Sequence, residues 1–186
     1  MIILVHGWRV GDGGAGTVDT FAEPLKKAGL RVDPHYADYG KLFLTRFGRI
    51  KSISEALAYR LSRDFPAKSV TLICHSNGLA IAHECIKHTS AVKTIISFNG
   101  ALNADASFSH TVDRVINFHS PHDWVLKWGA WLRPFHSWGR AGQSGLSSAD
   151  PRITNICMDD VKGHSKVFQV KSLREKYAQK VIDLVK

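Results

Sequence analysis

The sequence predicts an α/β fold built on a mostly parallel sheet of about six strands. Short apolar runs rich in β-branched residues alternate with stretches whose apolar residues recur at helical spacing. Glycine or proline separates several of these segments. Because alternating strands and helices form parallel βαβ units, we expect the 186 residues to form one domain spanning 1–186.

The first segments of the chain predict a strand, a helix and a second strand. Ile2–His6 is apolar almost throughout, which is typical of a buried parallel strand. Thr20–Ala28 has one apolar face, and a glutamate three residues after Thr20 gives the spacing of a capping box. Pro24 then has to lie in the first turn of this helix. A glycine follows, and Leu30–His35 is the second expected strand.

The middle of the chain repeats this alternation. Ile53–Phe65 carries an apolar stripe, is preceded by Ser52 with a glutamate three residues later, and is ended by Pro66. Val70–Cys74 is the next expected strand, and Asn77–His88 is the helix that follows it.

The remaining elements are two inner strands, a last strand and a closing helix. They are expected at Val92–Phe98, Arg114–His119, Ile153–Met158 and Ser172–Val185. Residues 124–148 interrupt the alternation, because this stretch holds four of the five tryptophans together with several glycines. We interpret it either as a small Trp-rich cap over a pocket or as an excursion packed on the core.

Composition limits the class of protein. The formal net charge of +9 comes from Lys and Arg scattered along the chain, which favours a solvated basic surface over a nucleic-acid site. No apolar run is long enough for stable membrane insertion, and no secretory signal is expected. The cysteines are odd in number and widely spaced, which predicts buried thiols and a cytoplasmic protein: Cys74, Cys85 and Cys157.

The segment Cys74-His75-Ser76-Asn77-Gly78 lies where a buried strand meets a helix. It resembles the G-x-S-x-G nucleophile elbow of the α/β-hydrolase family, with Cys74 in place of the first glycine. Such a turn lifts the serine oxygen above the sheet and needs small residues where strand and helix approach. The alternative is a serine that only caps the helix. The resemblance implies an α/β-hydrolase fold that lacks the two leading antiparallel strands of the family.

The resemblance also implies an acid and a base downstream of Ser76. Asp123 follows the strand Arg114–His119, and His164 follows the last strand, so the chain order is Ser, Asp, His as in the family. His164 would accept the proton of Ser76, and Asp123 would orient the imidazole. Three other aspartates are weaker candidates for the acid: Asp113, Asp159 and Asp160.

The resemblance further assigns the oxyanion hole. His6-Gly7-Trp8 is similar to the HG-x turn of lipases and esterases, so the backbone amides of Trp8 and Asn77 are the expected donors. His75, Trp124 and Trp128 are the candidate substrate-binding residues, on the view that tryptophans line an apolar pocket. Core packing and base stacking are the alternatives for the tryptophans.

These observations together predict a cofactor-free serine hydrolase that cleaves a small carboxylic ester or thioester through an acyl-enzyme. A catalytically silent relative acting as a scaffold is a second possibility, which an intact triad disfavours. The glycines of 11–16, with Asp33 downstream, match a dinucleotide-binding fingerprint but begin too far after the first strand. A metal site at His119, His122, Asp123 and His136 lacks a firm set of ligands.

Overall fold

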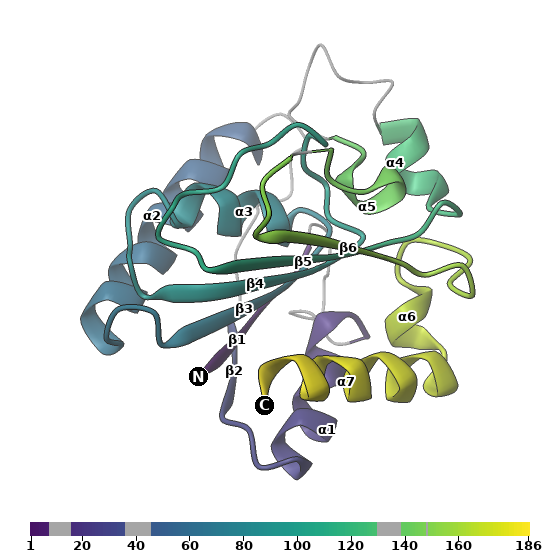
Figure 1. The fold of residues 1–186 in the computed structure, drawn as a ribbon, viewed down its shortest axis with the longest axis horizontal. Helices are drawn as coiled ribbons and strands as arrows, with labels where there is room; N and C mark the ends of the chain where they lie inside the picture. Colours follow the sequence, from purple (N-terminus) through teal and green to yellow (C-terminus); the bar gives the residue numbers. More distant parts are fainter. Residues whose placement is uncertain (8–15, 36–45, 130–138, 148) are drawn as a thin grey trace.

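The protein contains a six-stranded sheet in which every described strand pair is parallel (Figure 1). This computed structural model describes residues 1–7, 16–35, 46–129, 139–147 and 149–186. The strand order is β2-β1-β3-β4-β5-β6. The strands are β1 Ile2–Val5, β2 Val32–His35, β3 Val70–His75, β4 Val92–Phe98, β5 Arg114–His119 and β6 Ile153–Cys157.

The strand order places a topological switch between β1 and β3, the second and third strands across the sheet. From β1 the chain first forms β2 on one side and then returns to form β3 on the other. Ligands of open parallel sheets bind where the strand order reverses, at the carboxyl ends of the strands. The resemblance of the Ser76 turn to a nucleophile elbow implies a site above the first and third strands of the sequence, β1 and β3, and the strand order reverses between these two strands.

Helices cover both faces of the sheet, so the strands are buried on two sides (Figure 1). One face packs against α2 and α3 through residues such as Leu57 and Ile81. The other packs against η1, α1, α6 and α7 through residues such as Phe21 and Phe168. The helices are η1 Val18–Phe21, α1 Ala22–Lys27, α2 Arg46–Asp64, α3 Gly78–Cys85, α4 Trp124–Gly129, α5 Ala141–Ser144, α6 Lys166–Gln169 and α7 Lys171–Val185.

The expected capping boxes are wrong. The first predicted helix divides into the 3₁₀ helix η1 and the α-helix α1, and Thr20 donates its hydroxyl to the oxygen of Thr17 at 2.7 Å instead of capping. Pro24 does lie in the first turn of α1, and Gly29 follows this helix with φ of 83°. Ser52 lies inside α2, where its hydroxyl donates to the oxygen of Arg49 at 3.0 Å.

The cysteine prediction is correct for two of the three residues. Cys74 and Cys85 are buried free thiols, but Cys157 is free and exposed at the end of the edge strand β6. Its Sγ donates to Asp159 Oδ1 at 3.0 Å. The residues of β6 are exposed or half-buried along the whole strand, and Cys157 shares this exposure. Within the described residues, no helix is both long and apolar enough to cross a membrane.

Candidate active site

Ser76 lies in the tight turn between β3 and α3. Its φ is 54°, in the left-handed region that residues with a β-carbon rarely adopt. The turn is held from both sides, because Ser76 N donates to the oxygen of Phe98 at 3.2 Å and Ser76 O accepts from Ala101 N at 2.9 Å. Such strain persists only where the surroundings impose it, and it is the backbone geometry expected for a nucleophile elbow.

Two glycines allow the close contacts that this turn requires. A β-carbon at residue 78 would overlap the carbonyl oxygen of Val5, so α3 can approach β1 only with glycine there. A β-carbon at residue 7 would lie 2.8 Å from Ser76 Cβ and 3.3 Å from Ser76 Oγ. Gly7 therefore leaves the space directly beside the serine hydroxyl open.

Cys74 occupies the position where the family motif has its first glycine. Its side chain is fully buried in the core beneath α3, and burial raises the pKa of the thiol well above its usual range. The thiol is therefore protonated at neutral pH and acts as a small apolar side chain. The strand and the helix accommodate cysteine at this position.

Asp123 and His164 meet beyond the carboxyl ends of β5 and β6. His164 Nδ1 lies 2.7 Å from Asp123 Oδ2. The aspartate is completely buried, and its other oxygen accepts the backbone N–H of Leu126 at 3.1 Å. Because a carboxylate only accepts, the neutral tautomer of His164 that fits this contact carries its proton on Nδ1 and a lone pair on Nε2. That tautomer is the one that a general base requires.

Asn99 is a further residue of this site, which the sequence motifs did not indicate. It follows β4, is fully buried, and donates from Nδ2 to Asp123 Oδ2 at 2.7 Å. Its φ of 49° turns the side chain toward Asp123, and asparagine tolerates this conformation better than most residues. An asparagine followed by glycine directly after a buried strand is the only sequence signal that points to it.

His75 connects the serine turn with the proposed base. It precedes Ser76 in the chain, is 3% exposed, and its Nε2 lies 3.1 Å from the main-chain oxygen of His164. The two imidazole rings are 4.8 Å apart between centroids. Burial, followed by the proximity of His164, holds the pKa of His75 well below its usual value, so this ring is neutral.

The other predicted site residues differ in their surroundings. Trp124 and Trp128 lie on α4, directly after Asp123, and are 63% and 70% exposed. This exposure rules out core packing for these two tryptophans. Asn77 is fully buried at the start of α3. Trp8 lies outside the described residues, as does most of the glycine-rich segment 11–16.

The rival acids have partners elsewhere in the protein. Asp113 pairs with Lys68, Asp159 accepts from Cys157, and Asp160 accepts from Lys176 and Tyr177. Asp33, required by the dinucleotide interpretation, forms an ion pair with Arg60. Among the described residues, no three His, Cys, Asp or Glu side chains are grouped as metal ligands.

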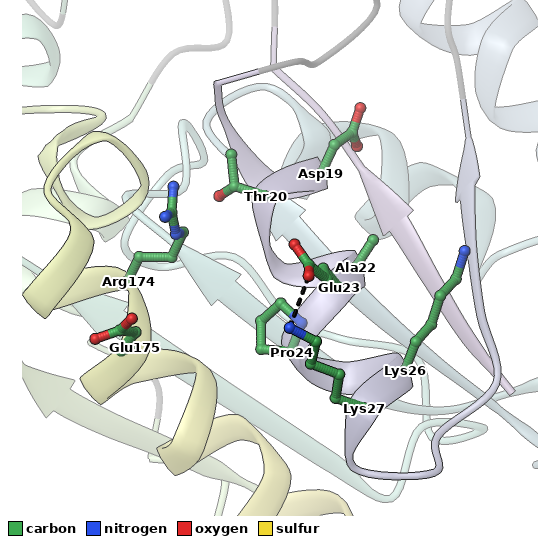
Figure 2. A pocket seen from close by; sticks show the side chains of 9 residues that line it. All are labelled: Asp19, Thr20, Ala22, Glu23, Pro24, Lys26, Lys27, Arg174 and Glu175. Atoms are coloured by element: carbon green, nitrogen blue, oxygen red, sulfur yellow. Dashed lines mark ion pairs between the residues drawn. The ribbon is translucent and has the colours of Figure 1, made fainter.

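A groove of about 980 Å³ between η1, α1 and α7 lies apart from these residues (Figure 2). Its wall includes Arg174 and Glu175 of α7 and the exposed ion pair between Glu23 and Lys27, 2.8 Å apart. Exposed pairs of this kind contribute little to stability or recognition. None of Ser76, Asp123 and His164 lines this groove, so we place the candidate site at the switch point instead.

Comparisons with known proteins identify the fold. No protein-family model matches the chain, and no curated protein matches it at a significant level. Among solved structures, an alpha/beta hydrolase enzyme from the sediment metagenome of the Mar Chica lagoon in Morocco has a TM-score of 0.66 at 11% identity, over 98% of this chain and 89% of the other.

Two esterases give similar results. The Pyrococcus furiosus esterase has a TM-score of 0.63 at 13% identity, covering 99% of this chain and 79% of that one. The esterase domain of a Rhodothermus marinus protein has a TM-score of 0.59 at 13% identity, covering 99% of this chain and 85% of that one. Together with the parallel six-stranded sheet and its order, these similarities show that the chain has the α/β-hydrolase fold.

Proposed function

We propose that the protein is a serine hydrolase that cleaves a small carboxylic ester or thioester. The observation that carries the proposal is the 2.7 Å contact between His164 Nδ1 and the buried Asp123, at the same end of the sheet as a serine with φ of 54°. An orienting acid, a histidine in the base tautomer and a serine in a strained strand-to-helix turn form the combination used in acyl transfer.

The proposed reaction has two steps. Ser76 Oγ attacks the acyl carbon while its proton passes to His164 Nε2, and the buried carboxylate of Asp123 stabilises the resulting imidazolium. The tetrahedral intermediate then expels the alcohol or thiol, which takes the proton from His164. Water, activated by the same histidine, attacks the acyl-enzyme and releases the acid and free Ser76.

Stabilisation of the oxyanion is assigned to backbone N–H groups. Asn77 directly follows Ser76, and its amide belongs to the first turn of α3, whose dipole favours negative charge. The amide of Trp8 is the proposed second donor, as in the HG-x turn of esterases. One such donor contributes about 3 kcal/mol to transition-state stabilisation in serine proteases.

The solved structures of similar fold bear on the substrate class. Several proteins of similar structure are esterases, which supports an ester over an amide. Trp124 and Trp128 remain the proposed substrate-binding residues, because the exposure of their rings leaves them accessible to a ligand. His75 was the third candidate, but it is only 3% exposed, so we assign substrate binding to the two tryptophans. The proposal includes no cofactor and no nucleic-acid partner, and the three free cysteines favour a cytoplasmic location.

The test is hydrolysis of short p-nitrophenyl esters and of matched thioesters by the wild-type chain, Ser76→Ala and His164→Ala. We expect wild-type turnover, with kcat lowered at least about a thousandfold in both variants. Lys162→Ala, an exposed substitution two residues before the histidine, is the control. A folded wild-type chain without turnover on any ester or thioester would favour the silent scaffold.

A further inference from the structure

His75 has two structural relations to His164 that a substrate-binding residue does not need. Its ring nitrogen Nε2 lies 3.1 Å from the main-chain oxygen of His164, and its ring packs against the imidazole itself at 4.8 Å. On another side the His75 ring meets Phe168 of α6, with centroids 4.9 Å apart. His75 therefore fills the space between the serine turn and the segment that carries the base.

The protonation of His75 follows from its partners. A carbonyl oxygen only accepts, so Nε2 carries the hydrogen and Nδ1 carries a lone pair. Nδ1 is buried, and no described residue forms a hydrogen bond with it. A second proton would leave a buried N–H without an acceptor among the described residues, beside His164 and near His6. His75 is thus a fixed neutral donor.

The segment that carries His164 needs such a donor. Gly163, the preceding residue, has φ of 131°, a conformation that only glycine adopts easily, and α6 begins only at Lys166. The side chain of His164 is held by Asp123, but this contact alone leaves the main chain of a glycine-preceded residue free to rotate. The hydrogen bond from His75 supplies a second point of attachment.

We infer that His75 is a positioning residue for the proposed base: its Nε2–H fixes the main-chain carbonyl of His164, so that the imidazole keeps its contact with Asp123. This inference rests on the proposed function. His75 also adds no charge beside His164, so it does not oppose the imidazolium that forms when Ser76 gives up its proton.

Two substitutions separate the hydrogen bond from simple packing. Glutamine at residue 75 can place an N–H close to the position of imidazole Nε2, whereas leucine fills similar volume without a donor. His75→Gln and His75→Leu therefore differ chiefly in whether residue 75 can donate a hydrogen bond to the main-chain oxygen of His164.

His83 provides a matched control. Its Nε2 lies 2.7 Å from the main-chain oxygen of Ser107, and its ring meets the edge of Phe108 at 5.3 Å between centroids. His83→Leu removes the same type of bond from α3 without touching His164. His83→Leu therefore shows whether losing such a bond on α3 slows labelling when His164 is untouched.

The first readout is inactivation by a fluorophosphonate probe, which needs no knowledge of the substrate. We expect the maximal inactivation rate of His75→Leu to fall about tenfold with an unchanged half-saturating probe concentration. His75→Gln should stay within about threefold of wild type, and His83→Leu should react at the wild-type rate even if its Tm is lower. Equal losses in Gln and Leu, or no loss in Leu, would overturn the inference.

The second readout does not depend on catalysis. In a Ser76→Ala background, the Nδ1 proton of His164 should give a strongly downfield NMR resonance in the parent and in His75→Gln. In His75→Leu it should move upfield or broaden through exchange with water. An unchanged resonance in His75→Leu contradicts the positioning role. A wild-type chain that the probe does not label contradicts the proposed function, and the NMR result then decides the positioning role separately.

Discussion

Ser76 and Asn99 directly follow the inner strands β3 and β4, each with a positive φ, 54° and 49°, and the Asn99 side chain donates to Asp123. Left-handed backbone is costly for residues with a β-carbon, by about 1–2 kcal/mol each. The strain at Ser76 is maintained by the main-chain bonds to Phe98 and Ala101. Local backbone strain is thus found at the residues where the proposed chemistry needs a fixed serine and an oriented carboxylate.

This strain predicts an unusual order of stability among variants of residue 76. Ser76→Gly should be more stable than Ser76→Ala by about 1 kcal/mol, because glycine adopts φ of 54° without a penalty. Urea unfolding of the two variants measures the difference. Ser97, buried within β4, is the control, where glycine should be the less stable of the two. Equal stabilities at residue 76 would show that the turn is not strained.

At the scale of single residues, the sequence predicts those residues that belong to a recognisable motif. Asp123 and His164 were predicted to meet because each follows a strand at the same edge of the sheet, and their side chains are in contact. Asn99 was missed because its role arises from a positive φ and from a partner 24 residues away, neither of which has a local signature. The contact of His75 with His164 spans 89 residues and is equally invisible in the sequence.

At the scale of elements, glycines control how closely α3 approaches the sheet. Gly78 begins α3 directly over the carbonyl of Val5 in β1. Any side chain at residue 78 would push the helix away and tilt the turn that holds Ser76. The approach of these two elements, and not the turn alone, therefore sets the geometry of the proposed nucleophile.

Gly78→Ala should be strongly destabilising and should also slow labelling of Ser76. The added β-carbon would overlap backbone, which cannot rotate away, so a loss of about 3 kcal/mol or more is expected. Thermal unfolding together with the probe reaction measures both effects. Gly29→Ala is the control: its φ of 83° costs about 1 kcal/mol, but nothing lies within 4 Å of the new atom. A Gly78→Ala chain as stable as Gly29→Ala would contradict the close approach.

Element types were easier to predict than element ends. All six strands were expected because apolar β-branched runs mark buried parallel strands. The start of α2 was misplaced at Ile53, whereas the helix begins at Arg46 and passes through Gly48. Ser54 shows why: its buried hydroxyl bonds to Ile50 O at 2.6 Å and to Ile81 O at 3.1 Å on α3, so tertiary packing extends the helix.

At the scale of the whole molecule, the fold holds two histidines, the buried His75 and the partly buried His83, with a lowered pKa despite a formal charge of +9. Burial lowers the pKa of both His75 and His83 below the usual value of 6.5. Neutral imidazoles inside the fold must take up protons when the chain unfolds in acid. The free energy of unfolding therefore depends on pH through two histidines: His75 beside the candidate site and His83 on α3.

The fold should lose stability as the pH falls from 6.5 to 5. Unfolded His75 binds a proton near pH 6.5, whereas the folded residue stays neutral to a much lower pH. The unfolded state then holds one more proton, so His75 lowers the free energy of unfolding by up to about 1.4 kcal/mol per pH unit below pH 6.5. Urea titrations across this range measure the slope. His75→Gln should flatten it, and an unchanged slope in that variant would contradict a buried neutral His75.

The strand order was the part of the whole fold that the sequence left open. Pro34 lies in β2, and a proline is tolerated there because β2 is an edge strand with its free side unpaired. The proline in β2 and the exposed side chains of β6 are both consistent with the positions of these two strands at the edges of the sheet. The switch point between β1 and β3 followed from the family resemblance and not from spacing.

The most direct test of Ser76 as the nucleophile is peptide mapping after reaction with a fluorophosphonate probe. We predict one adduct per chain, located on Ser76, absent in Ser76→Ala and formed far more slowly in His164→Ala and in Asp123→Asn. An adduct on another residue, or a folded wild-type chain that gains no mass, would contradict the assignment of Ser76 as the nucleophile.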